Sequence, residues 1–208
     1  MHCKQYFNDE AHCYHVEQLI SFSKKDYKIR NIDANPKVGN EVMLASNDDK
    51  YQPVFSNDAK EFRKMFGDVA FLRTWDPDTS KREQLYYLDE SYAKANAYKV
   101  VRIKDKNKEG KHLFNVQCVY FTVNSQWDIY EGDNYNDKSK RIMTIKSNVK
   151  ENKRALTVCG GPDDGAVLAL IWTDIMQATE NFRCKIAPNC DHSLIMAILV
   201  AARMSEIN

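Results

Sequence analysis

The chain has 208 residues, of which 30 are basic and 29 acidic, so its formal net charge is only +1. This balance argues against a dedicated nucleic-acid-binding protein, and the length suits one large domain or two small ones. Six cysteines are too few for a disulfide scaffold, and the polar N-terminal stretch MHCKQYFNDEAHCYH lacks the apolar core of a signal peptide. We therefore expect reduced thiols in an intracellular, globular protein.

Most of the chain carries the pattern of short β-strands. Apolar and polar side chains alternate with a period of two, and turn-forming stretches such as EGDNYNDKS and GGPDDG separate the segments. The predicted strands are residues 17–23, 26–32, 41–46, 69–75, 84–88, 97–104, 112–123, 126–131, 140–146, 154–159, 166–172 and 181–187. Two segments predict helices instead: NDAKEFRKMFG at 57–67, which has a capping start and a closing glycine, and the weaker DESYAKAN at 89–96.

The stretch DHSLIMAILVAARM, residues 191–204, predicts a helix that is apolar on every side. No polar side chain occurs from Leu194 to Ala202, whereas a surface helix has a polar face. A helix of this length measures about 21 Å, too short for a bilayer core of about 30 Å. Asp191 is suited to cap the first turn. We expect a helix buried by protein, with core residues Leu194, Ile195, Ile198, Leu199 and Val200.

About twelve strands and one wholly apolar helix have a simple structural solution. The sheet closes into a β-barrel, which removes its exposed edges, and the helix fills a lumen too wide for side chains alone. We therefore predict a mainly β fold, a closed barrel of roughly 12 strands around a central hydrophobic C-terminal helix at 191–204. Residues 16–208 form this single domain, and residues 1–15 form a polar N-terminal arm.

Two segments resemble the LURP-one-related family of the tubby C-terminal-like superfamily. The family closes with a strand, a proline, a capping aspartate, an apolar run, and an acidic residue before a final aliphatic one. The tail FRCKIAPNCDHSLIMAILVAARMSEI, residues 182–207, has this order, and SQWDIYEGD (125–133) followed by IMTIK (142–146) is similar to the family's tryptophan-centred strand, turn and next strand. The resemblance implies a closed barrel around a hydrophobic helix. Its relatives include tubby proteins, which bind phosphoinositides, and phospholipid scramblases.

Candidate chemical sites in the sequence are weak. HCYH at 12–15, together with Cys3, has zinc-ligand residue types without a standard spacing, so a polar arm explains it better. Asp191 and His192 are adjacent, and adjacent helical residues point apart, so a capping turn is favoured over a catalytic pair. CGGPDDG at 159–165 is better explained as a hairpin loop than as a phosphate site or a calcium site through Asp163 and Asp164. We expect no catalytic residue, no metal and no cofactor.

Charge is unevenly distributed along the chain. Residues 138–154 carry seven basic side chains and one acidic, residues 99–111 six basic and two acidic, and residues 41–90 eleven acidic and seven basic. A solvated, lysine-rich pair of hairpins would explain this pattern, and so would a face for an anionic partner. We predict such a face from the two basic segments, with candidate lipid-binding residues Arg102, Lys104, Lys140, Arg141, Lys146, Lys153 and Arg154.

These observations predict a non-enzymatic binding module in the cytoplasm, peripheral at the inner face of a membrane. We expect it to dock on anionic lipid, such as a phosphoinositide, or on a protein partner in signalling. The alternative is a scramblase-like protein that acts on bilayers through its terminal helix. We expect a monomer that neither crosses the membrane nor binds nucleic acid.

Overall fold

The computed structural model describes residues 7–18, 27–33, 53–63, 67–74, 78–81, 83–90, 97–103, 110–119, 126–135, 137–148, 155–173 and 181–206. Over these residues the fold is mainly β with one C-terminal helix, which confirms that prediction. The elements are β1 (Phe7–Asn8), β2 (His12–Gln18), β3 (Tyr27–Asn31), β4 (Pro53–Arg63), β5 (Gly67–Thr74), η3 (Thr79–Lys81), β6 (Gln84–Glu90), β7 (Ala97–Ile103), β8 (Gly110–Val119), β9 (Gln126–Glu131), η4 (Lys138–Lys140), β10 (Arg141–Asn148), β11 (Ala155–Gly160), β12 (Ala166–Thr173), β13 (Phe182–Ile186), β14 (Cys190–Asp191) and α1 (His192–Glu206).

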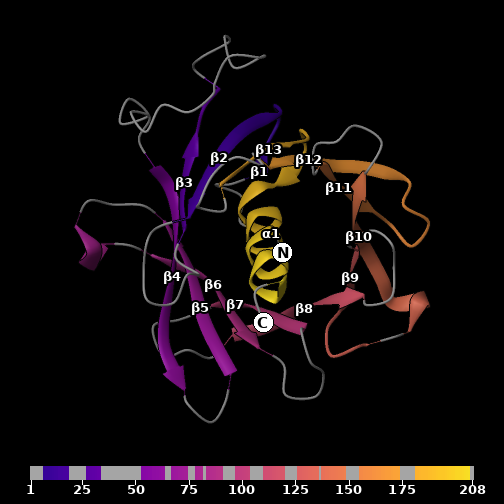
Figure 1. Ribbon diagram of the computed structural model, residues 1–208, viewed down its shortest axis with the longest axis horizontal. Coiled ribbons are helices and arrows are strands. Elements are labelled where there is room, and N and C mark those ends of the chain that lie inside the picture. Colours follow the sequence, from indigo (N-terminus) through magenta and orange to yellow (C-terminus); the bar gives the residue numbers. More distant parts are fainter. Residues whose placement is uncertain are drawn as a thin grey trace.

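An antiparallel sheet surrounds the helix. Its strands follow the order β10-β11-β12-β13-β2-β3-β4-β5-β6-β7-β8-β9, and β9 also pairs with β10. Figure 1 shows α1 in the middle of these strands. The short strands β1 and β14 form a separate pair beside the start of the helix.

Alternating side chains explain why the sheet has a dry and a wet face. In β9, Trp127 and Ile129 are fully buried against the helix, whereas Gln126 and Asp128 belong to the outer face. Residues directly opposite each other in an antiparallel pair share a face, so each register extends this pattern to the next strand. The period of two in the sequence therefore predicts the burial in the structure.

Helix α1 forms the centre of the core. Ile195, Ile198, Leu199 and Val200 are at most 3% exposed, as predicted, and Leu194 is partly buried against the same cluster. Asp191 caps the helix, because its Oδ1 accepts a hydrogen bond from the Leu194 backbone amide at 3.1 Å. The helix has no wet face because its residues from Ile195 to Ala202 are all buried in the core.

The predicted helix at 57–67 is wrong. Residues 57–63 belong to β4 and Gly67 begins β5, whereas residues 64–66 lie outside the described part of the chain. The local signal for a helix was a capping residue with apolar side chains at helical spacing. Pairing with β3 on one side and β5 on the other supplies backbone hydrogen bonds along this stretch, and tertiary context of this kind overrides weak local propensity.

Other boundaries differ more modestly. Strand β2 begins at His12 and pairs with β13 and β3, so the sheet takes in residues that were expected to lie in the N-terminal arm. Asp89 and Glu90 end β6, and the rest of the predicted helix at 89–96 lies outside the described residues. The predicted strand at 41–46 also lies outside them.

Candidate binding surface

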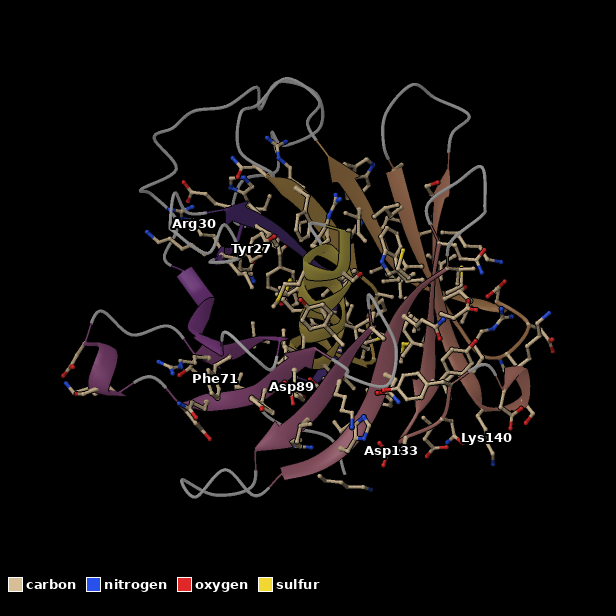
Figure 2. The ribbon with its side chains drawn as sticks, turned by 60° about the horizontal axis from the view of Figure 1, so that its bottom comes forward. Tyr27, Arg30, Phe71, Asp89, Asp133 and Lys140 are labelled. Atoms are coloured by element: carbon tan, nitrogen blue, oxygen red, sulfur yellow. The ribbon has the colours of Figure 1, made fainter. Side chains whose placement is uncertain are left out.

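Lys140 is the most accessible of the predicted lipid-binding residues that the structure describes. It ends η4, a single 3-10 turn that leads into β10, and its side chain is exposed. Asp137 caps this turn by accepting a hydrogen bond from the Ser139 amide at 3.0 Å. Figure 2 shows Lys140 at the opposite side of the helix from Arg30. Lys140 precedes the first residue of β10. The alternation of side chains along β10 therefore does not determine whether the Lys140 side chain points to the same face as Lys146.

Lys146 lies on the outer face of β10 and contacts an acid. Its register partners are Gln126 and Thr157, whereas the neighbouring Ile145 is fully buried on the inner face. The Lys146 ammonium pairs with the Asp164 carboxylate from the β11–β12 turn. The side chain remains 42% exposed, so the ion pair lies at the surface. Lys146 is available to solvent, but its charge is partly compensated.

Asp164 is held in place by the turn and by two donors. Its φ of 57° lies in the left-handed region, which aspartate tolerates better than most residues. Thr144 and Lys146 both donate to its carboxylate. Burial raises the pKa of this carboxyl, but the hydrogen bonds from Lys146 and Thr144 outweigh burial, so the net pKa is lowered. The segment 159–165 is therefore a hairpin turn, as expected.

Arg141 belongs to a polar cluster on β9 and β10. Its guanidinium lies 3.6 Å from Asp128 and also donates to the Pro162 carbonyl. Asp128 further accepts hydrogen bonds from Gln126 at 3.0 Å and from the Tyr130 hydroxyl at 3.2 Å. Burial, followed by the negative charge of Asp128, raises the pKa of Tyr130 to about 12. The cluster anchors Arg141 against the sheet.

Arg102 does not share a face with Lys146. It lies on β7, separated from β10 by β8 and β9. In the register between β6 and β7, Val100 is opposite Leu88 and Arg102 is opposite Tyr86, so Arg102 has the parity of core residues. Its side chain is half-buried. The predicted face would need Arg102 on the outer side.

The basic segment at residues 99–111 also contacts an acidic residue from elsewhere in the chain. Asp133 follows β9, and its carboxylate lies 3.6 Å from the Lys99 ammonium and 2.9 Å from His112. Together with Asp128 and Asp164, this residue brings negative charge to segments that look strongly basic in the sequence. Of the predicted lipid-binding residues, Lys104, Lys153 and Arg154 lie outside the described part of the chain.

A row of exposed apolar side chains on β12 escaped the sequence analysis. Val167 is 53% exposed, and Leu170 and Trp172 are each 40% exposed, whereas Ala169 and Ile171 are buried. The stretch AVLALIW is apolar throughout, so its composition alone did not predict which of its side chains face outward. The period-two rule, applied with Ile171 pointing inward, would have placed Leu170 and Trp172 on the outside.

The polar network at the start of α1 is structural. The Tyr14 hydroxyl contacts His192 Nδ1 at 2.9 Å, and His192 Nε2 lies 3.2 Å from the Ala187 carbonyl. This arrangement fits a neutral imidazole that donates through Nε2 and accepts through Nδ1. Burial lowers the pKa of His192 and raises that of Tyr14. Asp191 points to the helix cap, so the adjacent pair serves as a capping turn.

The described histidines near the N-terminus do not converge on a metal. His12 pairs with Asp33 and lies on the inner-face parity of β2 with Tyr14, whereas His15 lies on the opposite face. Across the described residues, no group of three or more histidine, cysteine or acidic side chains is arranged to hold a metal ion. Cys3 lies outside those residues.

The family follows from the whole span of the chain. The sequence matches the LURP-one-related family model over residues 12–203. The chain belongs to the LURP-one-related family. This match begins at the first residue of β2 and ends within α1, so it covers strands β2 to β14 and most of the helix. The Trp127 segment that carried the resemblance lies inside the match, and so does the tail from Phe182 to Arg203.

Two further comparisons were made for this LURP-one-related protein, one with curated proteins and one with the requirements for a membrane-spanning helix. A search of curated proteins gave no match. Within the described ranges, no helix combines the length and the apolar character needed to cross a membrane.

Proposed function

We propose that this LURP-one-related protein is a non-enzymatic, cytoplasmic binding module that docks on an anionic membrane surface from the inner face, with phosphoinositide as the lipid. The observation that carries the proposal is the exposure of Lys138 and Lys140 in η4, which leads directly into β10, where Lys146 lies on the outer face. Each basic residue near an anionic leaflet contributes about 1 kcal/mol. A few such residues give weak, reversible and salt-sensitive binding.

The acidic partners refine this proposal. Asp164 and Asp128 partly compensate Lys146 and Arg141, so these two residues contribute less than their number suggests. Lys140 has the largest share because it is exposed at the end of η4. A protein partner with an acidic surface remains the second candidate, since the same cations would attract it.

We also propose that the sheet acts as a closed barrel that keeps α1 inside. The pairing of β9 with β10 through Thr144–Asp128 and Ile145–Trp127 supports closure. The scramblase-like alternative requires α1 to leave the sheet and enter the bilayer. That step would expose the apolar faces of both the helix and the surrounding strands, so we favour docking with the helix in place.

Liposome co-sedimentation of the full chain tests the proposal. Vesicles of phosphatidylcholine alone are compared with vesicles that also contain phosphatidylserine or a phosphoinositide, at low and at high salt. We expect binding to the anionic vesicles only, with loss at high salt. The variant Lys140→Glu should bind about thirtyfold more weakly, because charge reversal changes the interaction by about two charges, or about 2 kcal/mol, near the leaflet.

Lys81→Glu is the matched control. Lys81 ends η3 as Lys140 ends η4, and both turns are preceded by an aspartate that accepts from the serine amide, Asp78 from Ser80 and Asp137 from Ser139. Lys81 lies between β5 and β6, away from β10 in the strand order. This variant should bind like the wild type. Equal weakening by both changes, or no binding by the wild type, would reject docking through η4.

A further inference from the structure

Strand β12 carries a row of exposed apolar side chains on its outer face. Val167, Leu170 and Trp172 are the exposed large apolar side chains among the residues whose burial the structure describes. All three lie on one strand, and the third is a tryptophan. Its large ring combines an apolar body with a polar N–H, which suits boundaries between apolar and aqueous phases.

The register places a cation directly opposite two of these side chains. Leu170 is paired with Lys185 and Trp172 with Arg183, both on β13. Directly opposite residues share a face and lie about 5 Å apart at Cβ. Figure 1 shows β12 and β13 side by side. We call Val167, Leu170, Trp172, Arg183 and Lys185 the β12–β13 patch.

The other side of β12 adds no acid to the patch. The β11 residues opposite Trp172, Leu170 and Val167 are Ala155, Thr157 and Cys159. One strand further, Lys146 is opposite Thr157 on the same outer face. Acids border the patch: in the β11–β12 turn Asp164 pairs with Lys146 and Asp163 is exposed, and beyond β13 Asp33 accepts a hydrogen bond from the amide of Cys13, the residue opposite Lys185. The patch is therefore apolar along β12 and basic along β13.

We infer that the β12–β13 patch is the part of the molecule that enters an anionic membrane interface, with Leu170 and Trp172 among the headgroups and Arg183 and Lys185 against lipid phosphates. This inference deepens the proposed membrane docking and rests on it. It extends the docking surface from η4 and β10 to the outer face of β12 and β13. It also supplies apolar contact, which the enclosed helix α1 does not provide.

The composition of the patch favours a lipid surface over a folded partner. Tryptophan, aliphatic side chains and flanking lysine or arginine are the residue types that anchor proteins at the headgroup level. A stable protein–protein interface needs about 800 Å² on each side, with a contiguous apolar core. The patch offers three partly exposed apolar side chains on the outside of a curved sheet, which suits shallow insertion into a fluid surface.

Vesicle binding by four versions of the full chain tests the inference. The apolar variant is Leu170→Ser with Trp172→Ser, and the charge variant is Arg183→Gln with Lys185→Gln. The matched control is Lys99→Gln with Lys111→Gln, which removes the same charge from the β7–β8 hairpin. Thermal melting first establishes that each variant folds like the wild type. We expect both patch variants to lose at least tenfold in partitioning to vesicles with 20% phosphatidylserine, a loss of about 1.4 kcal/mol, and the control to keep its binding.

Fluorescence gives a second, independent measurement. The chain has three tryptophans, Trp75, Trp127 and Trp172, and Trp127 is fully buried beside the helix. Vesicles with brominated acyl chains should quench the emission of the wild type, and Trp172→Phe should abolish this quenching while it retains most of the binding. Quenching that persists in Trp172→Phe would contradict insertion through β12.

The possible outcomes separate the two proposals. If the wild type binds anionic vesicles and the patch variants bind equally well, the inference is overturned and docking through η4 survives. If the wild type binds none of the vesicles, both proposals fail. If the wild type instead forms dimers that the apolar variant dissociates, the patch binds a second copy of the chain and the lipid assignment is wrong.

Discussion

Alternate residues of the same strands, β10–β13, form the inner and the outer face of the sheet. The two faces nevertheless hold their side chains differently. On the inside, Ile145 and Ile171 are at most 1% exposed and pack on the helix. On the outside, Lys146 shares its charge with Asp164, and Leu170 and Trp172 reach into solvent. Packing fixes the inner face, and few contacts fix the outer one. Substitutions inside should therefore change stability, and substitutions outside should change binding.

Removal of the helix gives the largest effect expected. Deletion of residues 191–208 takes away the large buried side chains Ile195, Met196, Ile198, Leu199, Val200 and Met204. At about 1.5–3 kcal/mol each, these contribute roughly 9–18 kcal/mol. Whole domains are stable by only about 5–15 kcal/mol. The truncated protein should be insoluble or unfolded by circular dichroism, and a soluble form that melts cooperatively would contradict the central role of α1.

A single substitution in the buried helix α1 should be nearly as damaging to stability. Ile198→Asp places a carboxylate at a fully buried position among apolar neighbours, at a cost of several kcal/mol. Ile198→Val keeps the shape and polarity of the site and should cost about 0.5–1.5 kcal/mol. Urea unfolding of both variants measures the difference. Equal unfolding midpoints would mean that the helix is loosely packed.

The other end of α1 tests a buried polar contact on the inner face. The Trp127 indole N–H donates to Ser205 Oγ at 2.9 Å, and both side chains are buried. Ser205→Ala leaves this N–H without its acceptor, which should cost about 1–3 kcal/mol. Adding Trp127→Phe to Ser205→Ala should cost less than the sum of the single changes, because the pair is lost once. Strict additivity in urea unfolding would show that the contact is unimportant.

His192 should give a smaller, pH-dependent effect. Burial lowers its pKa, so the folded state favours the neutral ring while the unfolded ring has an ordinary pKa of about 6.5. As the pH falls through this value, the unfolded state takes up a proton that the folded state resists, so stability decreases until the lowered pKa is passed. His192 contacts Tyr14 and lies beside His12. The difference in unfolding free energy between pH 7.5 and 5.5 should shrink in His192→Gln, and an unchanged difference would assign the effect to other groups.

The sequence predicts the inner face better than the outer one. Period-two alternation gave most strands to within a few residues, and the apolar run from Leu194 gave the buried helix, because burial imposes a regular pattern. The helix expected at 57–67 failed because pairing with β3 and β5 outweighs local preference. That competition depends on residues far away in the chain, which no local pattern records.

The outer face depends on contacts between distant segments. The sequence identified Lys140, Arg141 and Lys146 as a basic group, but it could not show that Asp128 and Asp164 come to lie beside them. Arg102 and Val100 lie two apart and share a face in any strand, but the sequence did not show that this face is the inner one, which the register with buried Leu88 does. Local charge counts therefore overestimated the basic character of these hairpins.

The ion pair between Lys146 and Asp164 should have the smallest effect on stability. The Lys146 side chain is 42% exposed, and pairs of this kind contribute only about 0.2–1 kcal/mol. Lys146→Met and Asp164→Asn should each lower the free energy of unfolding by no more than this amount; asparagine is chosen because it tolerates the φ of 57° at this position. The lowered pKa of Asp164 means that its contribution is present at neutral pH and disappears as the carboxyl is protonated below its ordinary range.

Vesicle binding should respond to the two substitutions in opposite directions: Lys146→Met weakens it by removing a cation, and Asp164→Asn strengthens it by releasing Lys146 from its acidic partner. Identical binding by the two variants would place this pair outside the docking surface, and a loss of several kcal/mol in stability would show that the outer face is fixed as firmly as the core.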